Sequence, residues 1–264
     1  MADEPPVPTY KFDNALASVF PSPKALGIAA AKAAASEIQK AVAERGRARI
    51  VVATGNSQID LMDSLACHKD VPWKRVEVFH LDEYLGIEPE HAASFHHWIK
   101  SRVESRLPVA KMNYIDGTTS DAQAEINRYA SLLMSGPIDV AFVGFGENGH
   151  IAFNEPEIAD FDDPAVAKVV ALDEASRLQQ VREGHFVDIG SVPKQAITLT
   201  CSTLFFAKSW ICSVPELRKA EAVRDALEGP ISTACPASLV RRHPSAFVFL
   251  DKDSASLLRF RNGH

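Results

Sequence analysis

Residues 49–66, RIVVATGNSQIDLMDSLA, contain in one short stretch the unit from which the fold is built. The apolar, β-branched run Arg49–Ala53 predicts a strand that is buried on both faces of a sheet. The polar turn Thr54–Gln58 then leads into the helical pattern of Ile59–Ala66. A strand, a polar turn and a helix in this order predict a parallel sheet covered by helices.

The same alternation recurs along the chain. The further predicted strands are Val76–Leu81, Asp139–Phe145, Ala196–Thr200, Trp210–Val214 and Ala246–Leu250. The further predicted helices are Ser94–Arg106, Asp121–Met134, Glu216–Leu227, Ala237–Arg241 and a long one that Ser22-Pro23 opens and Gly46 ends. We predict a single α/β domain over residues 22–264, with a mostly parallel, Rossmann-like sheet and helices on both faces. The Pro-rich residues 1–21 are predicted to be a flexible, loosely packed lead-in.

The composition excludes several classes of protein. The 264 residues include 28 Lys and Arg against 34 Asp and Glu, a net charge of −6, so the chain lacks the positive field of a protein that binds nucleic acid or anionic membranes. No apolar run approaches the ~18 residues of a membrane span. The start, MADEPPVPTY, does not have the layout of a secretion signal. Four cysteines without C-x-x-C spacing predict reduced thiols, and we expect a cytoplasmic protein.

Polar residues follow two of the predicted strands, where the functional groups of a parallel sheet gather. Thr54, Gly55 and Ser57 stand between the first strand and its helix. Their hydroxyl and amide groups can either bind an anion such as phosphate or simply cap the helix. Asp82 and Glu83 directly follow the second strand. Because neighbouring residues of a strand point to opposite faces, we expect at most one of these carboxylates in a site. The other is expected to cap the next turn or to face water.

The segment after the third strand, GFGENGHIAFNEP (Gly144–Pro156), carries the most information. Its glycines spell G-x-G-x-x-G, the pattern of a dinucleotide-binding loop, which requires a helix to begin there. The acidic residues around Pro156 do not form an amphipathic helix, so we exclude a dinucleotide site. The glycines are instead predicted to let the backbone pass close to a small ligand, with His150 and Glu155 beside it. Histidine is the side chain best suited to proton transfer near neutral pH.

Lys219 lies near the start of the predicted helix Glu216–Leu227, where a positive charge is unfavourable to the helix dipole. A phosphate that is shared with this helix end explains the placement, and a solvated lysine is the alternative. The adjacent histidines His96 and His97 diverge on a helix and lack the acid or cysteine that would complete a set of ligands. We therefore predict no metal site.

Several of these segments resemble the glucosamine-6-phosphate deaminase (isomerase) family, within the superfamily that also holds 6-phosphogluconolactonases. The matching strings are LDEYLG (81–86), GFGENGHIAFNEP (144–156), VPK (192–194) and EGPISTACPAS (228–238), and the resemblance covers roughly residues 20–250. The lactonases share a G-x-G-x-D-G-H loop but typically continue with a string like Ser-Leu-Phe-Pro. Here Phe153-Asn154-Glu155-Pro156 stands instead, which is deaminase-like. The resemblance implies the deaminase/isomerase type of Rossmann-like fold.

The resemblance also implies roles for residues at matching positions. Asp82 matches the base that moves a proton between C1 and C2, His150 matches the histidine that assists ring opening at O5, and Glu155 matches the acid that supports this histidine. The phosphate-binding residues that it implies are Thr54, Gly55, Ser57, Arg182 and Lys219. No metal or organic cofactor is implied. Homo-oligomers are common in the family.

One position departs from the family's pattern. The family usually has Asn-Asp-Gly-His in this loop, and its Asp is a catalytic base that works with the histidine. Here the order is Glu147-Asn148-Gly149-His150. Because an amide cannot accept a proton as a carboxylate does, three explanations stay open. Glu147 substitutes for the missing carboxylate, or Glu155 and His150 suffice, or the substrate differs.

The expected activity is the conversion of glucosamine 6-phosphate and water to fructose 6-phosphate and ammonia, by isomerisation and deamination. The alternatives are a deaminase for another hexosamine phosphate, such as galactosamine 6-phosphate, a 6-phosphogluconolactonase, and a sensor that binds a sugar phosphate without turnover. In each case the expected partner is a small sugar phosphate, and neither nucleic acid nor a membrane.

Overall fold

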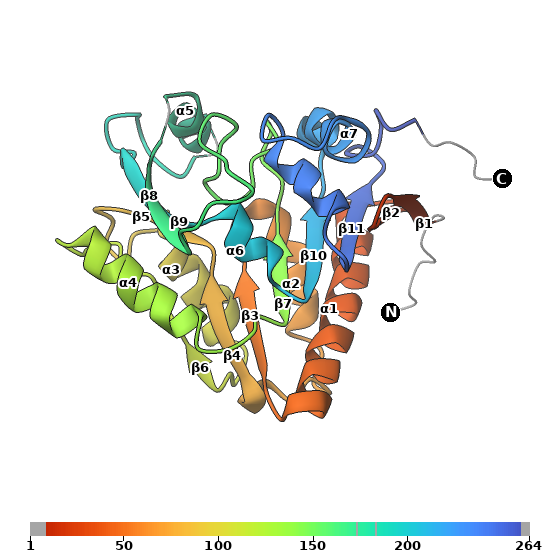
Figure 1. The fold of residues 1–264 in the computed structure, drawn as a ribbon, viewed down its shortest axis with the longest axis horizontal. Helices are drawn as coiled ribbons and strands as arrows, with labels where there is room; N and C mark the ends of the chain where they lie inside the picture. Colours follow the sequence, from red (N-terminus) through yellow and green to blue (C-terminus); the bar gives the residue numbers. More distant parts are fainter. Residues whose placement is uncertain (1–8, 173, 183, 260–264) are drawn as a thin grey trace.

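The computed structural model describes residues 9–259, except residues 173 and 183, and its centre is an eight-stranded sheet (Figure 1). The strands are β1 (Thr9–Phe12), β2 (Ala15–Phe20), β3 (Ala48–Val52), β4 (Val76–His80), β6 (Lys111–Met112), β7 (Val140–Val143), β10 (Ser209–Val214) and β11 (Ala246–Asp251). Their order is β1-β2-β11-β10-β7-β3-β4-β6, and every pair of neighbours except β1 and β2 runs parallel. The predicted, mostly parallel α/β sheet is confirmed.

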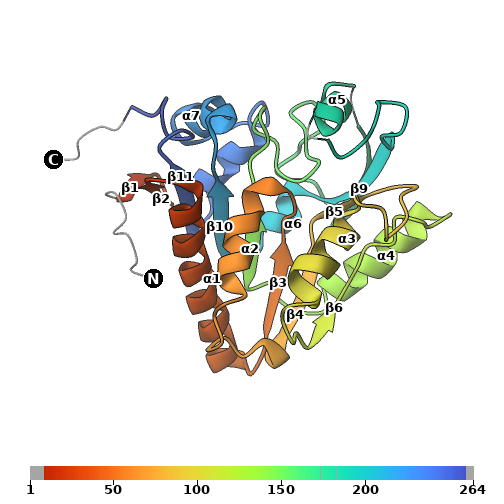
Figure 2. The same cartoon turned by 180° about the vertical axis from the view of Figure 1, so that it is seen from behind.

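Helices cover both faces of the sheet, as the sequence predicts. The helices are α1 (Pro23–Arg45), α2 (Ile59–Leu65), α3 (Phe95–Ile99), its π-helical continuation η3 (Lys100–Glu104), α4 (Ala122–Leu133), α5 (Glu174–Arg182), α6 (Cys201–Phe205) and α7 (Ala220–Glu228). Short 3₁₀ turns are η1 (Asn56–Gln58), η2 (Trp73–Arg75), η4 (Leu217–Lys219) and η5 (Pro236–Arg241). Figure 2 shows α1, α2 and α3 in front of the sheet, whereas α4 and α6 lie on the opposite face in Figure 1. In the described part of the chain, no helix has the length and apolarity that a membrane crossing requires.

The ends of α1 form as the sequence predicts. Ser22 is the N-cap, and its Oγ accepts a hydrogen bond from the amide of Ala25 at 3.2 Å. Pro23 occupies the first helical position, where its missing amide hydrogen costs nothing. Gly46 ends the helix in the left-handed conformation, with φ of 74°, and its amide donates to Val42 O.

The structure differs from the predicted loose lead-in (residues 1–21) at residues 9–20. Residues 1–8 of this lead-in lie outside the described part of the chain. Residues 9–20 form the hairpin β1–β2, and β2 pairs in parallel with β11 at the side of the main sheet. Alternate side chains of β2, those of Ala15, Ala17 and Val19, are buried. The prolines around this segment obscured its alternating pattern, which the open edge of β11 stabilises as a strand.

A second, antiparallel sheet was not predicted. It consists of β5 (Asp82–Tyr84), β9 (Gln195–Leu199) and β8 (Ala167–Ala171), in the order β5-β9-β8. The predicted strand Ala196–Thr200 therefore belongs to this sheet and not to the parallel one. The predicted strand Val76–Leu81 ends at His80, and the chain crosses at Leu81 into the second sheet. The apolar run in the sequence does not show where the chain crosses, because the residues directly before and after the crossing are all buried.

Buried hydrogen bonds fix the crossing between the two sheets. His80 is 0% exposed, and its Nε2 accepts a hydrogen bond from the amide of Ile115 at 2.9 Å. The ring proton therefore sits on Nδ1, which donates to Asp82 O at 2.8 Å. The hydroxyl of Tyr129 accepts from His80 N and donates to His80 O, both at 2.8 Å. Both backbone groups of the last residue of β4 are thus satisfied by one side chain.

We expect Tyr129→Phe to destabilise the protein by about 1–3 kcal/mol, because it leaves the buried amide and carbonyl of His80 without a partner. Urea unfolding followed by circular dichroism measures the change. Tyr114→Phe is the matched control, because the Tyr114 hydroxyl donates only to the exposed Glu104, and it should change stability by less than about 0.5 kcal/mol. Equal effects of the two substitutions would contradict this account of the crossing.

Candidate active site

A pocket of about 150 Å³ opens where four parallel strands end, next to the second sheet. Its walls come mainly from the segments that follow β3, β4, β7 and β10, with additions from α3, α5 and the loop after α5. The lining residues are Ala53, Thr54, Gly55, Asn56, Ser57, Leu81, Asp82, Phe95, Gly144, Phe145, Gly146, His150, Ala152, Phe153, Gln180, His185, Arg218 and Lys219. The pocket lies at the carboxyl edge of the sheet, where the sequence predicts the site.

Asp82 and Glu83 serve different purposes. Glu83, which is 1% exposed, accepts hydrogen bonds from the Ser94 hydroxyl and from the amides of Phe95 and His96, so it caps the start of α3. Asp82, which is 6% exposed, lines the pocket. Burial, reinforced by the neighbouring charge of Glu83, raises the pKa of Asp82 well above its usual value. Of the two carboxylates, only Asp82 lines this pocket, which agrees with the expectation that at most one of them enters the site.

Close contacts explain two glycines of the loop after β7. A Cβ atom at position 146 would lie 2.3 Å from ring atoms of His150, so only Gly146 lets the imidazole lie against the backbone. A Cβ at Gly149 would lie 2.5 Å from Cys235 Sγ, and its φ of +82° also favours glycine. No helix forms within Gly144–Pro156, all of which is described, so this loop does not have the helix N-terminus that a dinucleotide-binding loop requires.

The same loop is fastened to the second sheet. Asn154 Nδ2 donates to Leu199 O at 2.8 Å, and the amide of Phe153 donates to Thr198 Oγ1 at 3.1 Å. Thr198 is also the register partner of Asp82 in the pairing of β5 with β9. The loop that carries the histidine and the strand that carries the aspartate are therefore held by one support.

His150, Glu155 and Asn148 form a connected group. His150 Nδ1 lies 2.9 Å from Glu155 Oε1. Asn148 Nδ2 donates to Glu155 Oε2, and Asn148 Oδ1 accepts from the amide of His150 at 3.1 Å. Both ends of the Asn148 amide are thus engaged, and the carboxylate of Glu155 stays against the imidazole. Nε2 is the nitrogen of His150 that this arrangement leaves for a ligand.

Hydroxyl groups and backbone amides occupy the turn after β3. Gly55 has φ of 98°, a conformation that favours glycine, and it leads the chain into η1. Gln58 Nε2 donates to Ser57 Oγ at 3.0 Å, so the hydroxyl proton of Ser57 points to another acceptor. Together with Thr54, this turn offers donors to an anion in the pocket.

Two cations stand beside this turn. Lys219, which is only 7% exposed, is the N-cap residue of α7 and lines the pocket. Arg218 also lines the pocket; its Nε donates to Glu216 Oε2 at 2.6 Å and its Nη1 to Glu147 Oε1 at 3.2 Å. Adjacent cations and hydroxyl donors are a suitable environment for a dianion.

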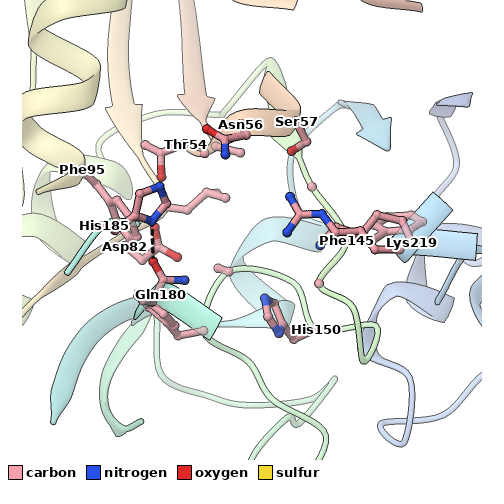
Figure 3. Close-up of a pocket in the computed structure, with 18 residues that line it drawn as sticks. Thr54, Asn56, Ser57, Asp82, Phe95, Phe145, His150, Gln180, His185 and Lys219 are labelled. Atoms are coloured by element: carbon pink, nitrogen blue, oxygen red, sulfur yellow. Dashed lines mark hydrogen bonds between the residues drawn. The ribbon is translucent and has the colours of Figure 1, made fainter. Parts of the chain in front are cut away.

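Figure 3 shows how the groups are distributed around the pocket. Ser57 and Lys219 lie toward one side, Asp82 lies on the opposite side, and His150 stands between them on the lower wall. Gln180 and His185 lie next to Asp82, and His185 Nδ1 is 2.9 Å from Gln180 Oε1. The pocket thus has a cationic, hydroxyl-rich end and an end with a buried acid.

Comparison with known proteins identifies the family. Residues 21–249 match the family model described as glucosamine-6-phosphate isomerases/6-phosphogluconolactonase. The chain belongs to this family. It is 36% identical over 222 residues to the glucosamine-6-phosphate deaminase of Lactobacillus delbrueckii subsp. bulgaricus. The aligned residues make up 84% of this chain and 92% of the relative. It is 37% identical over 210 residues to the glucosamine-6-phosphate deaminase of Exiguobacterium sibiricum, with 79% and 81% covered.

Solved structures of this family share the fold. A monomeric glucosamine-6-phosphate deaminase superposes with a TM-score of 0.83 at 30% identity, covering 92% of this chain and 99% of the other. A 6-phosphogluconolactonase from Shewanella baltica superposes with a TM-score of 0.74 at 23% identity, covering 92% and 99%. The second likeness concerns the fold alone.

The structure brings together most of the residues that the sequence singles out in this family member. Those that line the pocket are Asp82, His150, Thr54, Gly55, Ser57 and Lys219, and Asn148 and Glu155 stand behind His150. Arg182 is exposed on α5 and does not line the pocket, and Glu147 is paired with Arg218 outside the lining. The structure therefore brings neither Arg182 nor Glu147 to the pocket wall.

Four polar lining residues were missed: Asn56, Gln180, His185 and Arg218. Arg218 directly precedes Lys219, and its position beside a predicted phosphate ligand was the only available signal. Gln180 and His185 come from a segment with no strand-end position or glycine motif to mark it. Among the described residues, no group of three or more His, Cys, Asp and Glu is arranged to hold a metal.

We expect Gly146→Ala to lower kcat/KM by roughly 10²-fold, because the new methyl group must displace the His150 imidazole, and ångström-scale misplacement of a reacting group costs about this much. Steady-state kinetics with glucosamine 6-phosphate measures the loss. Gly190→Ala is the control: Gly190 is exposed, and its added methyl would meet only the Asp188 side chain, at 3.2 Å. Wild-type kinetics for Gly146→Ala would refute the close contact.

Proposed function

We propose that the protein is a glucosamine-6-phosphate deaminase, which converts glucosamine 6-phosphate and water to fructose 6-phosphate and ammonia. The observation that carries the proposal is the placement of a buried acid, Asp82, and a carboxylate-supported imidazole, His150, in one pocket with a cationic, hydroxyl-rich end. Relatives that bear this name at 33–37% identity over most of the chain support it.

The phosphate of the substrate binds at the end formed by Thr54, Gly55, Ser57 and Lys219. Hydroxyls and a buried ammonium group provide charge-assisted hydrogen bonds to its oxygens. The phosphate takes no part in the chemistry, and its binding energy orients C1 and C2 of the sugar toward Asp82. The separation of Ser57 and Lys219 from Asp82 in Figure 3 supports this orientation.

Ring opening comes first and uses His150. The imidazole takes the proton of the O1 hydroxyl and returns a proton to O5, so the C1–O5 bond breaks and an aldehyde forms at C1. Glu155, 2.9 Å from Nδ1, stabilises the positive charge that the ring acquires in this step. Asn148 holds Glu155 in place and is a positioning residue. These two partners supply the support that the sequence left in question, without Glu147.

Isomerisation and deamination follow at C1 and C2. Asp82 takes the proton from C2 while O1 gains the proton that the ammonium group gives up, which forms an enolamine. Asp82 then delivers its proton to C1, which gives a protonated imine at C2. Water then adds to this imine and ammonia leaves, which yields fructose 6-phosphate. A carboxylate with a raised pKa suits this work, because a base is most effective when its pKa lies near the working pH.

We also place the protein in the cytoplasm. We class the reaction of water with the imine, which releases ammonia, as a hydrolysis. The four cysteines, Cys67, Cys201, Cys212 and Cys235, are all free thiols, which a reducing compartment maintains. Burial raises the pKa of Cys235, which lies against Gly149, to about 11, so this thiol is not a nucleophile at neutral pH.

Purified protein is expected to release equimolar ammonia and fructose 6-phosphate from glucosamine 6-phosphate. Coupled assays for each product measure the two amounts independently. Galactosamine 6-phosphate and 6-phosphogluconolactone serve as competing substrates. Faster turnover of either one, or binding of glucosamine 6-phosphate without product, would overturn the proposal.

We expect Asp82→Asn to lower kcat by roughly 10²–10⁴-fold, the usual contribution of a general base. The same variant should be more stable than the wild type at neutral pH. The pKa of Asp82 is raised on folding, so its contribution to stability is greatest below the unfolded pKa and is lost as pH rises through the folded pKa. For the same reason, wild-type kcat/KM should rise with pH through this pKa. Activity assays and thermal unfolding between pH 4 and about 8 measure the three effects.

Asp163→Asn is the matched control for the stability effect. Partial burial opposes the shift, but hydrogen bonds from Lys168 and from the amide of Ala165 hold the pKa of Asp163 below its usual value. Its contribution is therefore present above the unfolded pKa, and its removal should destabilise the protein at neutral pH. A loss of stability in both variants would contradict the account of Asp82.

A further inference from the structure

We propose that Arg218 is an additional ligand of the substrate's phosphate and that Glu147 is its counter-ion in the ligand-free protein, which the phosphate displaces. The inference rests on the proposed function, and it deepens it, because it links the phosphate end of the pocket to the loop that carries His150.

The position of Arg218 supports its role. It lines the pocket directly beside Lys219 and comes from the connection between β10 and α7, and the turn that carries Ser57 lines the same pocket. Its side chain is 32% exposed. A planar guanidinium binds phosphate with two parallel hydrogen bonds, which an ammonium group cannot do.

The backbone before Arg218 is held in a strained conformation. Glu216 has φ of 83° although it is not glycine, and its amide donates to Asp251 Oδ2 at 3.0 Å. Such conformations persist where surrounding contacts enforce them, and they cluster at ligand-binding sites. Here the strain directs η4, with Arg218 and Lys219, toward the pocket.

The two carboxylates that hold Arg218 are suited to exchange. Glu216 and Glu147 are each 39% exposed, so water can solvate either of them when it is released. An ion pair this exposed contributes little free energy, whereas a phosphate dianion in the pocket gains charge-assisted bonds from the guanidinium. The Nη1–Oε1 contact of Arg218 with Glu147 is the longer of the two, at 3.2 Å, against 2.6 Å for Glu216. Glu147 is therefore the carboxylate that the phosphate displaces.

The displacement reaches the reacting end of the pocket through the chain itself. Glu147 directly precedes Asn148, which holds Glu155 against His150. In this structure the Arg218–Glu147 contact connects the β7 loop to the β10–α7 connection. Phosphate binding releases the β7 loop from this contact while Asn148 keeps its own bonds.

The first test uses inorganic phosphate, so that it does not depend on turnover. Phosphate binding to the full chain is measured by ³¹P NMR titration. Arg218→Gln should weaken binding about tenfold or more, the value of a lost charge-assisted bond. Glu147→Gln should tighten it by about two- to fivefold, because the competing exposed ion pair is gone.

Two control variants on α7 carry the same changes in net charge. Arg224→Gln removes a cation that is paired with Asp225, and Glu221→Gln removes an exposed carboxylate. Both should leave the phosphate affinity unchanged. In the double variant Arg218→Gln/Glu147→Gln, the second substitution should have no further effect, which isolates the pair from general electrostatics.

The second readout is KM for glucosamine 6-phosphate, which should follow the phosphate affinities: higher in Arg218→Gln and lower in Glu147→Gln. The inference is overturned if phosphate does not bind the wild type, if Arg218→Gln binds it normally, or if Glu147→Gln weakens it or changes it as much as Glu221→Gln does. A different failure, normal phosphate shifts without turnover of glucosamine 6-phosphate, would overturn the proposed function and leave the role of Arg218 intact.

Discussion

The site depends on one buried imidazole at the crossing between the two sheets. Burial lowers the pKa of His80 to about 3, so the ring is uncharged near neutral pH. Its Nε2 accepts from Ile115, its Nδ1 donates to the carbonyl of Asp82, and its backbone is held by Tyr129. A neutral imidazole can make both of these ring contacts, because the nitrogen that carries the proton donates and the other nitrogen accepts. These hydrogen bonds fix the backbone between the end of β4 and Asp82.

This rigidity explains how one strand end supplies two different carboxylates. The chain leaves the parallel sheet after His80 and pairs with β9, so Asp82 faces the pocket and Glu83 faces the start of α3. Glu83 is satisfied by several donors, whereas burial leaves the charge of Asp82 poorly solvated. The fold thus accepts an unfavourable charge at one position and places it where the proposed reaction needs a base.

The sequence was sufficient for the repeating part of the structure and insufficient for contacts between distant segments. Buried strands and the caps of α1 have local signals, and Asp82, His150 and Ser57 follow strands, so their convergence could be predicted. The crossing at Leu81 could not, because it depends on β9, more than a hundred residues away. The same limitation concealed Arg218, whose place in the pocket depends on the enforced backbone of Glu216 and on Asp251.

The contacts of Asn148 with Glu155 and His150 explain why an amide fits at position 148. Asn148 donates to one oxygen of Glu155 while the other oxygen faces His150 Nδ1, so a single carboxylate serves both neighbours. An aspartate in the same place would set a second carboxylate beside Glu155, and the repulsion between them would raise the pKa of one of the two. Asn148 avoids this conflict and still accepts the amide of His150. With Asn148 in place of the family's usual Asp, Glu155 alone carries the negative charge beside the His150 imidazole and still supports it.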